Sequence, residues 1–500
     1  MSETAQKDVV AFLGKRETYG GTDSVETIDT HISRVFLVGD RVYKLKRAIR
    51  LPYVDFTTLA ARKRACDQEL SLNRRTAPDI YLDVVAVWRA DDGVLHLGGD
   101  GGEVVDWVVM MRRFDQNKLL DALAQTPGAL TRTHMEDLAE ILFAFHGKAE
   151  IIRDRGGRAA MAAIARNNVE ALQTFGAGRF DTAKTQRLAE QTGAQLGKIG
   201  ALLDRRRDQG HVRRGHGDLH LRNIVLLEGH PTPFDCIEFN EDFAIVDTMY
   251  DLAFLMMDLE HRNLRDLANS ALNRTLDLSG DIDALACLPL FLSLRAAVRA
   301  HVDAAQKKFA EAVEYLDLAL GFLNPPPPRL IAVGGLSGSG KSSLARLVAP
   351  TIGGTPGAVV LRSDAIRKRL AGVGLYDKLD TASYTTEMSD RVYAQILEDA
   401  RRAIAAGHSA ILDAVYARPE ERANAGALGA ELGVPFDGLW LDVPLSVREQ
   451  RIGGRKKDAS DATRTVAQAQ ETYDLGPIDW HMLDATADLG GLERQAAQIL

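Results

Sequence analysis

The chain has 500 residues, too many for one hydrophobic core, so two or three domains are expected. Its 46% hydrophobic and 26% charged residues are typical of a soluble globular protein. The net charge of -8 argues against a general nucleic-acid-binding protein, which usually carries a basic surface. Cys66, Cys236 and Cys287 have neither metal-ligand nor disulfide-framework spacing. With no signal-peptide pattern at the start, we expect a cytoplasmic protein.

Residues 30–113 predict a small sheet lobe. "VFLVGDRVYKLK" places a Gly-Asp turn between two apolar segments, and "IYLDVVAVW" and "VVDWVVMMRRF" predict further strands. The segment "LAARKRACDQELSLNRR" predicts one helix among these strands. Residues 114–324 have mostly amphipathic helix patterns, including a buried helix at 287–294 and a long helical segment at 294–323. Residues 1–324 therefore predict an α+β domain with a sheet lobe and a larger helical lobe.

Four consecutive prolines at 325–328 mark the clearest domain boundary. They cannot continue a helix or join a sheet, and they favour a stiff extended linker. Residues 329–500 then alternate helices with four short apolar strands, "LIAVGG", "VVLRS", "AILDA" and "GLWLDVP". This alternation predicts a second, α/β domain with a parallel sheet.

The stretch "GHGDLHLRNIVLLEGHPTPFDCIEF" at 215–239 has the residues that phosphoryl transfer from ATP requires. Such a transfer needs a carboxylate for the hydroxyl proton and oxygen ligands for magnesium. Asp218 is the candidate base, and Asn223 and Asp235 follow at the spacing of kinase magnesium ligands. We expect His216 to brace this loop rather than take part in the chemistry.

The motif "HGDLHLRN" followed by "FDCIEF" resembles the aminoglycoside phosphotransferase family, a branch of the protein-kinase-like fold. The resemblance extends over most of residues 30–320. It implies a phosphate-binding lysine on a strand, best matched by Lys44, and a helical glutamate paired with it, best matched by Glu69. Lys46 is the alternative lysine, because side chains two apart on a strand share a face. The family's structural aspartate matches Asp251. The chain departs from the family in lacking a Gly-rich loop before Lys44.

A second phosphate-binding motif, "GLSGSGKSS", begins at residue 335, between an apolar strand and a helix. Its glycines let backbone N–H groups surround phosphates, its lysine reaches the β- and γ-phosphates and its first serine after the lysine binds magnesium. The predicted nucleotide-binding residues are Gly335, Ser337, Gly338, Ser339, Gly340, Lys341, Ser342 and Ser343.

Two aspartates follow other predicted strands of this domain. Asp413 ends "AILD" and is either a magnesium ligand with Ser342 or an ordinary aspartate at a helix start. Asp364 follows "VVLR", where it either faces the substrate hydroxyl as a base or caps the next helix. Its placement resembles that in small P-loop kinases such as gluconate kinase, in which an aspartate after the second strand accepts the hydroxyl proton.

The basic segment "VREQRIGGRKKDASDATR" at 447–464 is broken by two glycines and follows the fourth strand. We interpret it as a lid that brings arginines to the transferred phosphate. Arg451 and Arg455 are the candidates, and Arg448 is a third; the alternative is a solvated helix with a glycine break.

These motifs predict an ATP- and Mg²⁺-dependent kinase with two nucleotide sites, each acting on a hydroxyl group of a small molecule. In one alternative, only one half is a kinase and the other is a regulatory nucleotide-binding domain. In another, the P-loop half acts on nucleic acid ends or nucleotide-sugars. We expect neither a membrane nor a general nucleic acid as partner.

Overall fold

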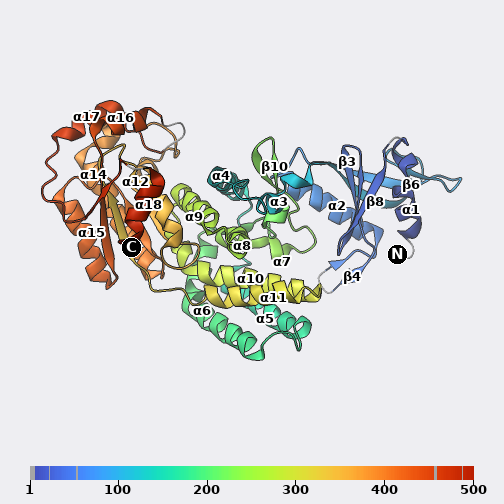
Figure 1. The fold of residues 1–500 in the computed structure, drawn as a ribbon. Coiled ribbons are helices and arrows are strands. Elements are labelled where there is room, and N and C mark those ends of the chain that lie inside the picture. The colour runs from blue at the N-terminus through green and yellow to red at the C-terminus, as the bar shows by residue number, and fades with distance from the viewer. Residues whose placement is uncertain (1–5, 22, 52–53, 455–458, 487) are drawn as a thin grey trace. The chain divides into compact units, whose positions relative to one another are not determined.

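The structure, a computed structural model, describes residues 6–21, 23–51, 54–454, 459–486 and 488–500 (Figure 1). It contains two compact units. The first unit comprises residues 1–130, 144–157 and 206–252, and the second comprises 131–143, 158–205 and 253–500. Prolines 325–328 form neither helix nor strand, and a domain boundary there stays a prediction. No helix in the described part of the chain is both long enough and apolar enough to cross a membrane.

The first unit contains a six-stranded antiparallel sheet in the order β1-β2-β3-β8-β6-β7. Helix α2 (Leu59–Asn73) begins at Thr58, whose side chain accepts a hydrogen bond from the N–H of Ala61. It packs on β6 and β8 through a core that includes Cys66 and Val109. The strands are β1 (Val25–Asp29), β2 (Ser33–Val38), β3 (Arg41–Lys46), β6 (Tyr81–Arg89), β7 (Leu95–Leu97) and β8 (Glu103–Arg112), and α1 (Lys7–Leu13) precedes them.

Short strand pairs complete this unit. The hairpin β10–β11 lies inside the 215–239 stretch, and its two turn residues, Glu228 and Gly229, have φ of 50° and 86°. Positive φ at both positions matches a type I′ turn, which suits the twist of a hairpin. The remaining elements are β4 (Arg50–Leu51), β5 (Val54–Asp55), α3 (Leu120–Leu123), β9 (Val212–Arg214), β10 (Ile224–Leu227), β11 (His230–Pro233), α7 (Glu241–Ala244) and β12 (Ile245–Asp247).

Long helices form most of residues 131–323, as the sequence predicts. The apolar run at 287–294 is confirmed as the buried start of a helix. The helical segment 294–323 is broken, because Lys307 adopts a positive φ of 63° and the N–H of Lys308 bonds to the carbonyl of Asp303. The helices are α4 (Arg132–Lys148), α5 (Gly157–Phe175), α6 (Thr182–Asp208), α8 (Thr248–His261), α9 (Arg265–Ser279), α10 (Leu288–Ala305) and α11 (Phe309–Phe322).

The C-terminal part of the second unit is a five-stranded parallel sheet in the order β14-β15-β13-β16-β17. Helices lie on both sides of it (Figure 1). The predicted α/β fold is confirmed, with a fifth strand that was not predicted because only one of its four residues is buried. The strands are β13 (Leu330–Gly334), β14 (Val359–Arg362), β15 (Ala410–Asp413), β16 (Phe436–Asp442) and β17 (His481–Asp484). The helices are α12 (Lys341–Val348), α13 (Ser363–Leu370), α14 (Thr386–Ala405), α15 (Pro419–Leu432), α16 (Leu445–Gly453), α17 (Arg464–Ala469) and α18 (Leu489–Ala497).

The edge strand β14 is covered by helix α9. The side chain of Asn273 accepts a hydrogen bond from the N–H of Val360 at 2.6 Å and donates one to the carbonyl of Ala358 at 3.2 Å. Asn269 donates to the same carbonyl at 3.0 Å. The Asn273 carboxamide thus supplies the donor and the acceptor that a neighbouring strand would supply, and it satisfies backbone groups that the sheet leaves unpaired.

We expect Asn273→Leu to speed up amide hydrogen exchange at the β14 edge. The N–H of Val360 would lose its acceptor while staying buried, a loss of roughly 1–3 kcal/mol that corresponds to about tenfold to hundredfold faster amide exchange. Hydrogen exchange of a peptide covering residues 358–362 measures it. Asn167→Leu on the exposed face of α5 is the matched control, and unchanged exchange in Asn273→Leu would contradict the assignment.

Candidate active sites

Lys44, the predicted phosphate-binding lysine, lies in a buried cluster of charges. Its ammonium group is 2.7 Å from a carboxylate oxygen of Glu69 on α2 and 2.7 Å from one of Asp235. Lys46, two residues on along β3, contacts the other oxygen of Glu69 at 2.6 Å and pairs with Glu238. The predicted contact between Lys44 and Glu69 is therefore present, and the alternative lysine shares the same glutamate.

The charge balance of this cluster is set by Glu69, whose side chain is fully buried. Burial alone would raise the pKa of its carboxyl group, but the ammonium groups of Lys44 and Lys46 lower that pKa to about 2. Burial raises the pKa of Glu238, which lies three residues after Asp235. Glu238 was not predicted, because Lys46, with which it pairs, lies 192 residues away in sequence.

Asp235 and Asn223 are brought together by the β10–β11 hairpin. The N–H of Phe234 bonds to the carbonyl of Asn223 at 2.9 Å, which places Asp235 directly beyond the hairpin. Asp235 has a φ of 62°, a strained conformation for a residue other than glycine. The N–H of Cys236, the next residue, bonds to the Asn73 side chain at 2.8 Å and helps to hold this bend.

The loop that carries Asp218 is held by Asp251. Each Asp251 oxygen accepts a backbone N–H, one from His216 at 2.8 Å and the other from Gly217 at 2.9 Å, and His146 contacts the first oxygen at 2.9 Å. Although burial opposes it, these contacts lower the pKa of Asp251. The ring of His216 bonds to the carbonyl of Phe234 at 2.9 Å. The geometry agrees with a structural Asp251 and a bracing His216.

The predicted base and one predicted magnesium ligand are neighbours. The amide nitrogen of Asn223 donates to an Asp218 carboxylate oxygen at 2.9 Å and to the Asp218 carbonyl at 3.0 Å. Because the amide nitrogen of Asn223 is hydrogen-bonded to Asp218, the amide oxygen points away from Asp218. Together with the Asp235 carboxylate it gives an all-oxygen donor set, which fits Mg²⁺. The roles of these three residues stay predictions.

The second site is built on the predicted phosphate loop between β13 and α12. Gly335, Gly338 and Gly340 have φ of 137°, 87° and 99°. A Cβ atom on Gly338 would lie 2.7 Å from the carbonyl oxygen of Arg448, so both conformation and space require glycine there. Lys341 begins α12, and its ammonium group donates to the carbonyl of Leu336 at 3.3 Å, across the loop.

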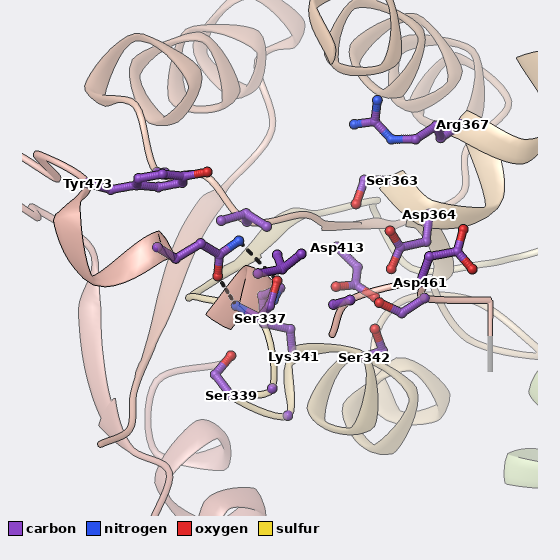
Figure 2. Close-up of a pocket in the computed structure, with 18 of the residues that line it drawn as sticks. Ser337, Ser339, Lys341, Ser342, Ser363, Asp364, Arg367, Asp413, Asp461 and Tyr473 are labelled. Carbon is purple, nitrogen blue, oxygen red and sulfur yellow. Dashed lines mark hydrogen bonds between the residues drawn. The ribbon is translucent and has the colours of Figure 1, made fainter. Parts of the chain in front are cut away.

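Among the carboxylates that line the same pocket as this loop are Asp364, Asp413 and Asp461 (Figure 2). Asp413 is 3% exposed, and its Oδ2 atom has no hydrogen-bond partner among the described residues. A buried carboxylate oxygen without a partner, in one pocket with the Ser342 hydroxyl, fits a bound cation such as Mg²⁺. Burial raises the pKa of Asp364, while Arg362 and Lys341 oppose that rise and Asp413 adds to it.

Two of the predicted lid arginines, Arg451 and Arg448, contact the phosphate loop. Arg451 donates to the carbonyl of Ser339 at 3.0 Å and to that of Ala485 at 2.8 Å. Arg448 is buried, donates to the carbonyl of Ser337 at 3.4 Å and pairs with Glu471. Arg455 lies outside the described residues. Arg451 and Arg448 thus brace the phosphate loop, and a part in the chemistry stays a prediction.

Sequence reasoning missed two residues of this pocket. Gln470 is buried, accepts a hydrogen bond from the N–H of Ser337 at 2.7 Å and donates to the Ser337 hydroxyl at 3.0 Å (Figure 2). Asp461 accepts hydrogen bonds from the hydroxyl of Tyr384 at 2.9 Å and from the N–H of Leu379 at 3.2 Å. Neither residue belongs to a motif with fixed spacing, so no local signal marked them.

The pocket is a cavity of about 1350 Å³. Of the eight residues of the "GLSGSGKSS" motif that were predicted to bind nucleotide, seven, from Ser337 to Ser343, line the cavity. Asp364, Asp413 and Arg451 also line it. The structure thus brings the predicted residues of the second site together around one space.

Fold and sites define a protein that joins a protein-kinase-like part to a P-loop kinase-like part. A sequence model of the AAA domain family matches residues 330–474, which supports the P-loop prediction. A solved structure of a thermostable mutant of aminoglycoside phosphotransferase APH(4)-Ia is 14% identical, with a TM-score of 0.40, and covers 63% of this chain and 97% of its own. A sugar kinase from Janibacter sp. is 24% identical, with a TM-score of 0.27, and covers 34% of this chain and 94% of its own.

The similarity to one group of proteins extends over nearly the whole chain. The uncharacterized protein Rv2004c of Mycobacterium tuberculosis is 31% identical over 491 residues, which are 95% of this chain and 94% of that protein. The uncharacterized protein Mb2027c of Mycobacterium bovis matches to the same extent. The chain belongs to the family of these mycobacterial proteins.

We expect the stabilisation that Glu69 provides to be lost in acid. Because its pKa is lowered in the folded protein, the stabilisation is complete above the ordinary glutamate pKa near 4.5 and disappears as the pH falls toward 2. Amide exchange of α2 in wild type and Glu69→Gln, measured from pH 5 to about 2, tests this. The difference between the two proteins should shrink with falling pH. The exposed Glu103→Gln is the control. A difference in α2 exchange between wild type and Glu69→Gln that does not vary with pH would contradict the prediction.

We expect Gly338→Ala to weaken nucleotide binding at the second site by roughly 100-fold, since the new Cβ displaces the loop against the Arg448 backbone. Equilibrium binding of a fluorescent ATP analogue measures it. Gly407→Ala is the matched control, because Gly407 also has a positive φ, of 85°, yet has no atom within 4 Å of an added Cβ. Equal binding by the two variants would show that the close contact at Gly338 is unimportant.

Proposed function

We propose that this protein is an ATP-dependent phosphotransferase with two nucleotide sites, each of which transfers the γ-phosphate of ATP to a hydroxyl group of a small molecule. The observation that carries the proposal is that both sites contain the same chemical set. Each has a lysine for the phosphates, a candidate base, and oxygen ligands for a metal ion.

In the first site, Asp218 is the base that orients the acceptor hydroxyl and takes its proton. Its carboxylate is oriented by Asn223, and its loop is fixed by Asp251. Lys44 holds the phosphates of ATP, and Glu69 keeps it in place. Asp235 and Asn223 hold Mg²⁺. Because Lys44 contacts Asp235 in the structure, nucleotide binding would exchange that contact for one between Lys44 and phosphate.

In the second site, backbone N–H groups of residues 338–343 and Lys341 surround the phosphates. Ser342 and Asp413 would hold Mg²⁺, which would offset the negative charge of the phosphates. Asp364 is the base. Burial raises its pKa, which makes it a stronger proton acceptor than an exposed aspartate. Arg451 and Arg455 are the candidates for stabilising the charge on the transferred phosphate.

The cavity of the second site has room for an acceptor beside the nucleotide. Its volume of about 1350 Å³ exceeds the roughly 300–1,000 Å³ that is usual for a single ligand. Besides the phosphate loop it is lined by Asp364, Tyr384 and Asp461, which offer an acceptor polar groups. We propose a small hydroxyl compound as acceptor in each site and the cytoplasm as the place of reaction.

The test follows phosphate from labelled ATP into a pooled metabolite extract with the full chain. We expect Asp218→Asn and Lys341→Ala each to remove a different labelled product, by about 100-fold or more, as is usual when a catalytic base or a phosphate-binding group is lost. The exposed changes Asp91→Asn and Lys148→Ala are the matched controls and should remove neither product.

Three other results would contradict part or all of the proposed function. If Lys341→Ala abolishes all transfer and Asp218→Asn changes nothing, the first site is a binding or regulatory site. If labelled products appear only with nucleic acid ends or nucleotide-sugars, the acceptor of the P-loop half is not a small alcohol. If no variant changes any product, the proposed function is wrong.

A further inference from the structure

Arg362 is a buried cation between two carboxylates that come from distant parts of the chain. It ends β14 and is 3% exposed. One terminal nitrogen of its guanidinium lies 3.4 Å from a carboxylate oxygen of Asp277 on α9. Its Nε atom lies 3.8 Å from Oδ2 of Asp413 at the end of β15. Because Arg362 and Asp413 are paired in the β14–β15 register, this neighbourhood is fixed by the sheet.

The contacts of Arg362 with Asp277 and with Asp413 differ in kind. The contact with Asp277 meets the distance of a hydrogen bond, whereas 3.8 Å to Asp413 is too long for one. Oδ2 of Asp413 accordingly has no hydrogen-bond partner among the described residues. Arg362 therefore offsets the charge of the buried Asp413 carboxylate without forming a hydrogen bond to its Oδ2 atom.

Helix α9 holds Asp277 in register with Arg362. Asn273 is tied to β14 at Ala358 and Val360. Asp277 lies four residues further along the helix, a rise of about 6 Å, and Arg362 lies two residues further along the strand, a rise of about 6.6 Å. The near match of these two rises explains why Asp277 reaches Arg362, and it makes the position of the guanidinium depend on α9.

We propose that Asp277 is a positioning residue for the P-loop site, which holds Arg362 back from Asp413 so that Oδ2 of Asp413 stays available to Mg²⁺. The inference rests on the proposed function of this site. It means that a helix from the N-terminal side of the proline segment completes the metal site of the C-terminal sheet. Without the Asp277 carboxylate, Arg362 would move toward Asp413 and compete with the cation for its oxygen.

The test measures how much Mg²⁺ strengthens the binding of a fluorescent ATP analogue to the full chain. Binding at the P-loop site is the component that Lys341→Ala removes, and it is measured in EDTA and over a range of Mg²⁺ concentrations. Asp277→Asn should raise the Mg²⁺ concentration for half-maximal binding about tenfold, a usual coupling between contacting charged groups, and leave binding in EDTA unchanged. Asp266→Asn, an exposed change of the same kind on α9, should change neither.

A double-variant cycle separates positioning from simple stabilisation. In Arg362→Gln no cation competes for Asp413, so adding Asp277→Asn should have no further effect on the Mg²⁺ dependence. Hydrogen exchange of residues 265–279 without metal reports whether Asp277→Asn loosens α9. The double variant also contains Asp277→Asn, so any such loosening is present in both proteins.

Three results would overturn the inference. Equal weakening by Asp277→Asn in EDTA and in Mg²⁺ would show a structural role, and additive effects in the cycle would show that Asp277 does not act through Arg362. An Asp277→Asn protein with wild-type Mg²⁺ dependence would remove Asp277 from the site altogether. If instead Lys341→Ala removes no ATP binding from the parent protein, the proposed function of the P-loop site itself is wrong, and the inference is lost with it.

Discussion

The buried contact of Glu69 with two lysines is the interaction on which the first site depends. Lys44 and Lys46 carry two positive charges into the interior on one strand, and a buried charge without a partner is costly. Glu69 supplies one carboxylate to both, and Asp235 and Glu238 supply the others. Strand β3, helix α2 and the segment 235–238 can therefore reach a low-energy arrangement only together, which brings the predicted phosphate-binding lysine next to the predicted metal-binding aspartate.

The two candidate sites hold their predicted metal-binding carboxylates in opposite ways. In the first, Lys44 bonds directly to one oxygen of Asp235, so an ammonium group already engages that carboxylate. In the second, Arg362 offsets the charge of Asp413 from a distance at which no hydrogen bond forms. The first carboxylate is thus engaged by an ammonium group, whereas the second keeps an oxygen with no hydrogen-bond partner among the described residues.

Both folds could be predicted from the sequence, and motifs with a fixed local spacing named residues that the structure brings close together, while the roles of those residues stay predictions. The sequence left Lys44 and Lys46 as alternatives, since period-two spacing puts both on one face, and the structure shows both bound to Glu69. Gln470, Asp461 and Glu238 could not be found in this way. Glu238 lies within "FDCIEF" and Asp461 within the segment 447–464, but neither pattern gives these positions a role, and Gln470 belongs to no motif, so only the folded chain shows the contacts.

The Asn273 carboxamide that covers β14 has a consequence for how the chain can be divided. A fragment that starts at the prolines would lack α9 and leave the backbone of an apolar edge strand open. Such an edge is a template for pairing with another chain, and natural proteins protect it. The C-terminal sheet would then be prone to self-association, although its phosphate loop and its own core are intact. Keeping α9 and the C-terminal sheet on one polypeptide thus protects that edge from pairing with another chain.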